Sequence, residues 1–194
     1  SRRAGARKRS SQAEEYSSLL TTVRSEIARI SGIIESFLRF ARPPKLEIGE
    51  VELSGIVADA AAVVEEKARV NGIAISVDIP GGIICRCDPA QMKQALLNLI
   101  LNAVEASGNG GKVIIAARDS GSEIILDVRD TGPGISDDIM PGIFDPYFTT
   151  KEHGTGLGLS EVHRIVTSHG GRVSASNAPS GGAVLTIRLP EKSA

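Results

Sequence analysis

The sequence predicts an α/β fold in which helices cover one face of a mixed β-sheet as a two-layer sandwich, preceded by a long bundle-forming helix. Two observations support this prediction. Apolar residues recur at alternating intervals of three and four over residues 14–41, which is the seam of a coiled coil or helix bundle. After residue 50, segments rich in β-branched residues alternate with helical patterns, which is typical of helices packed on a sheet.

Length and charge limit what such a chain can do. Its 194 residues suffice for one full domain and part of another. The net charge of −1 argues against nucleic acid or an anionic membrane as a partner. No apolar run approaches the roughly 18 residues of a membrane span, and no signal peptide is recognisable. We therefore expect a cytoplasmic fragment without membrane contact, whether or not its parent protein is membrane-tethered.

The first predicted helix covers residues 14–41 and ends before Pro43, because proline cannot continue a helix. Its seam consists of Leu20, Val23, Ile27, Ile30, Ile34, Phe37 and Ala41. One helix alone cannot bury so long a stripe, so we expect a homodimer through this segment; packing on the chain's own domain is the alternative. This assigns residues 1–42 to a partial dimerisation region, 43–50 to a linker and 51–194 to a second domain.

The second domain is predicted to alternate helices and strands. Asp88 followed by proline is a strong helix start, and Asn71-Gly72 is a helix stop. Helices are expected at residues 53–70, from 89 to at least 103, and from the glycine-rich motif to 168. Strands are expected at residues 73–79, 83–87, 112–118, 124–128, 172–176 and 183–189. Residues 134–154 have the composition of a mobile loop.

Both cysteines lie in one predicted strand. Cys85 and Cys87 would share a face, too close in sequence for an unstrained disulfide. No further thiol is available to complete a zinc site. We expect reduced thiols with a structural role.

The helix predicted to start at residue 89 carries a pair of asparagines within Asn98-Leu-Ile-Leu-Asn102. Residues four apart share a helix face, so the two amides lie one turn above the other. An amide oxygen can bind Mg²⁺ and leave phosphate oxygens and water to complete the shell. Taken alone, such a pair is more often two solvated asparagines.

A second motif, Asp130-Thr-Gly-Pro-Gly134, follows the strand expected at 124–128. A carboxylate at a strand end can accept a hydrogen bond from the exocyclic amine of adenine, whereas guanine carries a carbonyl there. Gly132 and Gly134 would let the backbone approach a base. An ordinary turn is the alternative interpretation.

The glycine-rich motif Gly154-Thr-Gly-Leu-Gly-Leu-Ser160 precedes the last predicted helix. Glycines before a helix N-terminus present N–H groups and a positive dipole end to phosphates. The spacing matches neither a Rossmann fingerprint nor a P-loop. A flexible loop with a good cap is the alternative.

These motifs, together with Phe144-Asp-Pro-Tyr-Phe-Thr-Thr-Lys151 between them, resemble the N, G1, F and G2 boxes of bacterial sensor histidine kinases. These kinases belong to the GHKL superfamily with gyrase, Hsp90 and MutL. The resemblance covers residues 51–190 and implies a Bergerat-type α/β sandwich that binds ATP and Mg²⁺ under a mobile lid, which would be the loop of residues 134–154. It implies that Asn102 binds Mg²⁺, that Asn98 contacts phosphate or metal-bound solvent, and that Asp130 binds the adenine amine.

The resemblance also assigns the remaining site residues. Gly132 and Gly134 would line the base pocket, and Lys151 would reach the γ-phosphate. The lid anchors would be Phe144, Tyr147 and Phe148. The phosphate-side loop would consist of Gly154, Thr155, Gly156, Leu157, Gly158 and Leu159.

One position separates branches of the superfamily. Members that hydrolyse ATP are expected to carry a glutamate one turn before the metal asparagine, as a general base. Asn98 occupies that position, and an amide cannot take a proton. We therefore expect phosphoryl transfer to a protein acceptor, with Asn98 and Lys151 as catalytic residues that position the phosphates and neutralise their charge.

The segment ending at Pro43 resembles the second helix of the dimerisation and phosphotransfer hairpin. None of the histidines (His153, His163 and His169) has the context of a phosphoacceptor, so we assign all three structural or peripheral roles. The acceptor is then expected on a helix of the same or a partner kinase chain, with relay to the receiver domain of a response regulator. The motif Phe148-Thr-Thr-Lys151 resembles the nitrogen-regulation subgroup. Alternatives are a non-catalytic ATP-binding regulatory module and an anti-sigma-type serine kinase.

Overall fold

The computed structural model describes residues 45–151 and 154–191, together with seven helical positions nearer the N-terminus. The chain forms two compact units, Ser1–Pro44 and Lys45–Ala194. No helix among the described residues is long and apolar enough to cross a membrane.

The described positions of the first unit belong to the predicted long helix. All seven are helical and exposed: Tyr16, Leu19, Leu20, Val23, Arg24, Ile27 and Ile30. The four of these that form the predicted seam are large apolar residues with 47–64% of their surface exposed. Such a stripe on a helix gains stability only by packing against a partner. The remaining seam residues, Ile34, Phe37 and Ala41, lie outside the described part of the chain.

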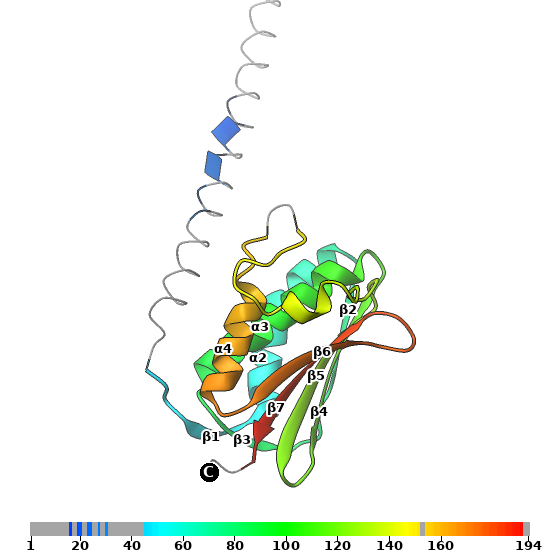
Figure 1. The fold of residues 1–194 in the computed structure, drawn as a ribbon. Coiled ribbons are helices and arrows are strands. Elements are labelled where there is room, and N and C mark those ends of the chain that lie inside the picture. The colour runs from blue at the N-terminus through cyan, green and yellow to red at the C-terminus, as the bar shows by residue number, and fades with distance from the viewer. Residues whose placement is uncertain are drawn as a thin grey trace, which may run out of the picture. The chain divides into compact units, whose positions relative to one another are not determined.

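The second unit is built on a five-stranded sheet with the order β2-β4-β5-β7-β6. Its strands are β2 (Ala74–Asp78), β4 (Lys112–Asp119), β5 (Glu123–Asp130), β6 (Arg172–Asn177) and β7 (Ala183–Pro190). Strand β2 pairs with β4 in parallel, whereas every other pairing is antiparallel. The predicted mixed sheet is therefore confirmed (Figure 1).

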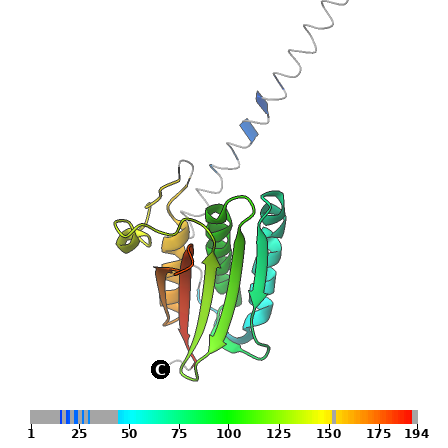
Figure 2. The same cartoon turned by 90° about the vertical axis from the view of Figure 1, so that its right-hand side faces the viewer.

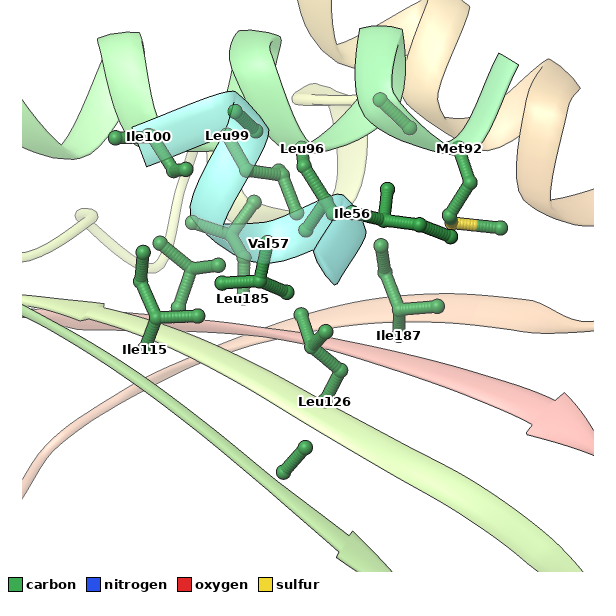
Figure 3. Packing of buried hydrophobic residues seen from close by; sticks show 14 of the residues in the cluster. Ile56, Val57, Met92, Leu96, Leu99, Ile100, Ile115, Leu126, Leu185 and Ile187 are labelled. Carbon is green, nitrogen blue, oxygen red and sulfur yellow. The ribbon is translucent and has the colours of Figure 1, made fainter. Parts of the chain in front are cut away.

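Three helices cover one face of this sheet: α2 (Leu53–Val70), α3 (Pro89–Ser107) and α4 (Gly158–Ser168). Figure 2 shows them side by side behind the strands, with α3 between α2 and α4. Buried side chains of the helices interdigitate with alternate residues of the strands, including Leu96 and Leu99 against Ile115, Leu126 and Ile187 (Figure 3). The predicted two-layer sandwich is confirmed, and α3 is its central helix.

The start of α3 is fixed by several hydrogen bonds to one side chain. Asp88 Oδ1 accepts from the backbone N–H groups of Ala90 and Gln91 at 3.0 and 3.1 Å, which confirms the predicted N-cap. Asp88 Oδ2 accepts from the backbone of Glu47 at 3.0 Å. The backbone N–H of Asp88 donates to His169 Nε2 at 2.9 Å. The chain entering the domain and the end of α4 are thereby tied to the helix that carries both candidate asparagines.

A separate two-stranded sheet lies beside this start. Strand β1 (Gly49–Glu52) pairs antiparallel with β3 (Ile84–Cys87). The predicted linker, residues 43–50, overlaps this strand at Gly49 and Glu50. The strand forms because β3 provides a hydrogen-bonding partner, which local sequence does not reveal.

The two cysteines of β3 behave as predicted. Both are buried and free, and their sulfur atoms lie 3.3 Å apart on the inner face of the strand. The hydrogen-bonding contact with the Cys85 sulfur, followed by burial, raises the pKa of Cys87, so this thiol stays protonated. No group of three or more histidine, cysteine or acidic residues capable of holding a metal occurs in the described part of the chain.

Candidate nucleotide-binding site

One stripe of α3 brings the four sequence motifs together. Asn98, Asn102 and Ala106 are spaced four residues apart, so they lie on one helix face. The buried face of α3 is formed by other positions, among them Leu99 and Ala103. Asn98 meets the start of α4, Asn102 meets the lid and Ala106 meets the loop after β5. The site is therefore a line along α3 with a different loop at each turn.

Asp130 ends β5 at one end of this line and is 3% exposed. Its Oδ1 accepts from the backbone N–H groups of Gly132 at 2.8 Å and Ala183 at 3.1 Å. Among the described residues, Oδ2 has no hydrogen-bond donor. This oxygen is therefore left to accept from solvent or from an incoming amine. This donor requirement fits the exocyclic amine of adenine.

The glycines after Asp130 are required by close contacts. A Cβ at Gly132 would stand 2.4 Å from the carbonyl oxygen of Ala106, so the loop touches α3 through bare backbone. Gly134 has φ +82°, a conformation that side chains disfavour. Its loop is held by Asn177, which accepts from the backbone N–H of Ile135 at 2.8 Å and donates to its carbonyl at 2.7 Å.

The glycine-rich motif starts α4 beside both asparagines. A Cβ at Gly158 would contact Asn102 Nδ2 at 3.8 Å and Asn98 Cγ at 3.9 Å. The N-cap position is Leu157, which offers no side-chain acceptor to the first turn. An uncapped helix N-terminus directs N–H groups and a positive dipole end outward, which suits phosphate oxygens.

Asn98 is held by α4. Its Nδ2 donates to Glu161 Oε2 at 2.9 Å and to the carbonyl oxygen of Gly158 at 3.3 Å. Glu161 is 6% exposed and lies in the first turn of α4, where the helix dipole favours an acidic side chain. No motif in the sequence indicated Glu161, because its contact with Asn98 spans 63 residues of sequence.

Lys151 of the lid lies against Asn102. Its Nζ is 2.9 Å from Asn102 Oδ1 and 2.5 Å from Glu105 Oε2, while Glu105 Oε1 is 2.6 Å from Lys67 Nζ. Burial raises the pKa of Glu105, but the hydrogen bonds from Lys151 and Lys67 outweigh it and place that pKa below its ordinary value. The Lys151 ammonium group thus donates a hydrogen bond to Asn102 Oδ1, the oxygen proposed to bind Mg²⁺. The sequence did not reveal this contact.

The lid residues differ in how they are attached. Phe144 packs on His163, with ring centroids 6.0 Å apart. Tyr147 is 60% exposed, and this residue is fixed instead through its backbone, whose N–H donates to the carbonyl oxygen of Gly156 at 2.9 Å. Phe148 is partly buried, and Tyr147 adopts φ 68°, which is strained for a side chain of this size. Figure 1 shows this segment, in yellow, alongside α3 and α4.

The described histidines make packing or hydrogen-bonding contacts. His169 is buried, with Nε2 accepting from Asp88 and Nδ1 2.8 Å from the carbonyl oxygen of Ile165. The ring is therefore the Nδ1–H tautomer and joins the end of α4 to the start of α3. His163 lies under Phe144, and His153 lies outside the described residues.

The oxygen atoms available as metal ligands fit a Mg²⁺ ion that binds together with a nucleotide. Asn102 offers a neutral oxygen, and the start of α4 offers room for phosphates beside it. A hard cation held by one or two protein oxygens and completed by phosphates and water is the usual arrangement for Mg²⁺. The ion would thus depend on the nucleotide for most of its ligands.

These features define an ATP-binding domain, and comparison with known proteins agrees. The sequence model of the histidine kinase-, DNA gyrase B- and HSP90-like ATPases matches residues 87–193. The chain belongs to this family. Its ATP-binding domain is homologous to the catalytic domains of sensor histidine kinases.

Sensor kinases are prominent among the similar proteins. The sensor histidine kinase ZraS of Klebsiella oxytoca is 35% identical over 179 residues, which cover 91% of this chain and 38% of ZraS. Sporulation kinase A of Bacillus subtilis is 34% identical over 172 residues, which cover 88% of this chain and 28% of that kinase. The chain thus spans less than two fifths of the length of the curated relatives it matches.

Solved structures of histidine kinases share the fold. The catalytic domain of ThkA superposes with a TM-score of 0.70 at 33% identity, covering 75% of this chain and 96% of that domain. ThkA in complex with the response regulator TrrA gives 0.75 at 29% identity, covering 87% of this chain and 49% of that chain. Full-length ShkA in complex with AMPPNP gives 0.80 at 27% identity, covering 91% of this chain and 39% of ShkA.

Proposed function

We propose that this chain is the catalytic core of a sensor histidine kinase. It binds ATP with Mg²⁺ and transfers the γ-phosphoryl group to a histidine on a dimerisation helix, for relay to an aspartate of a response regulator. The observation that carries the proposal is the α3 stripe, which aligns an amide pair with a carboxylate oxygen that has no donor among the described residues and with an uncapped helix start. The relative ThkA, solved with the regulator TrrA, supports a response regulator as partner.

Recognition of the base falls to Asp130. Its Oδ1 is committed to two backbone N–H groups, so only Oδ2 faces an incoming ligand as an acceptor. Adenine offers an amine to this oxygen, whereas guanine offers a carbonyl and would leave two acceptors opposed. Gly132 and Gly134 have no side chains, so the adenine ring could approach their backbone closely.

Recognition of the phosphates falls to the other end of the stripe. The first turn of α4 from Gly158 supplies N–H groups, and Lys151 supplies a cation once it leaves Glu105. Asn102 Oδ1 would hold Mg²⁺, which neutralises phosphate charge when it is bound. The motif from Gly154 to Leu159 closes beside the phosphates, and Phe144 fixes one end of the lid on α4.

Transfer is favoured over hydrolysis because α3 lacks a base at the expected place. Asn98 occupies that position, and its nitrogen is engaged by α4. The histidines of the described residues make internal contacts, so we place the acceptor on a helix of the same or a partner kinase chain. The exposed seam of the first unit is suited to the homodimer that would bring such a helix near. Because ATP is an intracellular compound, we place the domain in the cytoplasm.

The test is phosphotransfer in trans. The chain is incubated with ATP labelled on the γ-phosphate and MgCl₂, with and without a separate fragment carrying the acceptor helix. We expect label on the acceptor histidine, none on a fragment with that histidine changed to glutamine, and none with the Asn102→Ala chain. Tight ATP binding without transfer to any acceptor would instead support the regulatory module.

A further inference from the structure

Glu161 is a buried acid that the proposed mechanism leaves without a role. It is 6% exposed, and its Oε2 accepts from Asn98 Nδ2 at 2.9 Å. A buried carboxylate is costly unless hydrogen bonds and favourable dipoles compensate it. The first turn of α4 supplies the dipole, and Asn98 supplies a hydrogen bond across the helix interface.

This contact determines which way the Asn98 amide points. The nitrogen lies between two oxygens, that of Glu161 at 2.9 Å and the carbonyl of Gly158 at 3.3 Å. Rotating the amide by half a turn would place its oxygen against both acceptors, which is unfavourable. Asn98 Oδ1 therefore points away from these two acceptors, and among the described residues no group donates a hydrogen bond to it.

The orientation decides between two roles for Asn98. Phosphate oxygens only accept hydrogen bonds, so a phosphate contact would need the nitrogen that α4 already holds. Water bound to a cation donates strongly, so it requires an acceptor such as Oδ1. Accepting from a metal-bound water would tie Asn98 to the ion without direct coordination, while Asn102 one turn away supplies the direct ligand.

We propose that Glu161 is a positioning residue that presents Asn98 Oδ1 to water of the Mg²⁺ shell. This inference rests on the proposed function, because it presumes that Mg²⁺ and ATP bind beside α3. Its consequence is that Glu161 governs how strongly Mg²⁺ improves nucleotide binding, without itself touching the nucleotide.

The competing role for Glu161 is a general base for hydrolysis. Its carboxylate reaches the neighbourhood of Asn98 from α4 rather than from α3. Glutamine separates the two roles, because it keeps an oxygen that can accept from Asn98 but cannot take a proton. Methionine has similar length and offers no comparable acceptor.

The experiment measures binding of a fluorescent ATP analogue to the native chain, Glu161→Gln and Glu161→Met, in EDTA and with MgCl₂ titrated. Thr167→Ala, an exposed change on the same helix, is the matched control. We expect Glu161→Gln to keep the Mg²⁺ enhancement within twofold. Glu161→Met should lose about tenfold of that enhancement, the worth of one hydrogen bond, while its affinity in EDTA stays within twofold.

A spectroscopic readout requires no nucleotide. The side-chain NH₂ resonances of Asn98, assigned by comparison with Asn98→Ala, should shift in Glu161→Met and stay near their native positions in Glu161→Gln. Three results would overturn the inference. These are an undiminished Mg²⁺ enhancement in Glu161→Met, equal losses in EDTA and Mg²⁺ accompanied by a lower Tm, or loss of ATP hydrolysis in Glu161→Gln. Failure of the native chain to bind the analogue at all would instead remove the proposed function.

Discussion

Replacing Asp130 by asparagine should reverse the hydrogen-bonding character of the base pocket. In the native chain, Oδ1 accepts from Gly132 at 2.8 Å and from Ala183 at 3.1 Å, which leaves Oδ2 for the ligand. An asparagine must place its oxygen at the Oδ1 position, because its NH₂ group would otherwise face two backbone N–H groups. The nitrogen then occupies the Oδ2 position and presents a donor to the base.

The magnitude follows from the contact that is lost. A hydrogen bond to a charged group contributes about 1.5–3 kcal/mol, so ATP affinity should fall roughly 10- to 150-fold. Inosine triphosphate carries a carbonyl in place of the amine and can accept from the new NH₂ group. Its affinity should therefore stay level or rise in the Asp130→Asn chain.

The assay is calorimetric titration of both nucleotides in MgCl₂, with Tm as a check on folding. Asp127→Asn is the matched control, because Asp127 lies on the same strand but on its other face, bonded to Arg118 and Thr186. The control should leave both affinities unchanged. Equal losses for ATP and inosine triphosphate in Asp130→Asn would refute the assignment of Asp130 to the adenine amine.

Three further outcomes are expected. Gly132→Ala should abolish ATP binding, because its Cβ would stand 2.4 Å from the carbonyl oxygen of Ala106 and must displace the loop or α3; native-like calorimetric binding would contradict this. Asp88→Ala should lower the free energy of unfolding by about 1–2 kcal/mol through loss of the N-cap, as measured by urea denaturation. Burial raises the pKa of Asp88, but backbone hydrogen bonds hold it below its ordinary value. Its contribution is therefore present above a pH of about 4 and lost as the pH falls through the folded-state pKa, so native chain and variant should converge in acid. Glu105→Gln should release Lys151 and raise Mg²⁺-dependent ATP affinity a few-fold, a modest effect because the pair is more than one third exposed; weaker binding would show that Glu105 supports the site instead.

Local signals accounted for most of the fold. The helix from Leu53 to Val70 has the predicted bounds, and Asp88 caps α3 as its sequence context indicated. The six predicted strands were found with ends that differ from the prediction by at most two residues. Helix caps, glycine stops and β-branched runs act within a few residues, so they can be recognised without the tertiary structure.

The chemistry of the site was only partly predictable. The motifs identified Asn98, Asn102, Asp130 and Lys151 as candidates, because amides and acids near glycine-rich loops have a restricted set of uses. The structure gathered these residues along α3. It also showed that Lys151 is paired with Glu105, which sequence spacing did not suggest.

The features that the sequence did not predict depend on contacts between residues far apart in the chain. Strand β1 exists because β3 lies beside it, and Glu161 orients Asn98 across 63 residues of sequence. Asn177 holds the loop after Gly134 across more than 40 residues. The sequence determined which segments become helices and strands, and its motifs predicted which part of the nucleotide each would bind. Tertiary packing alone decided the direction of each polar group, because a hydrogen bond depends on where its partner is placed in space.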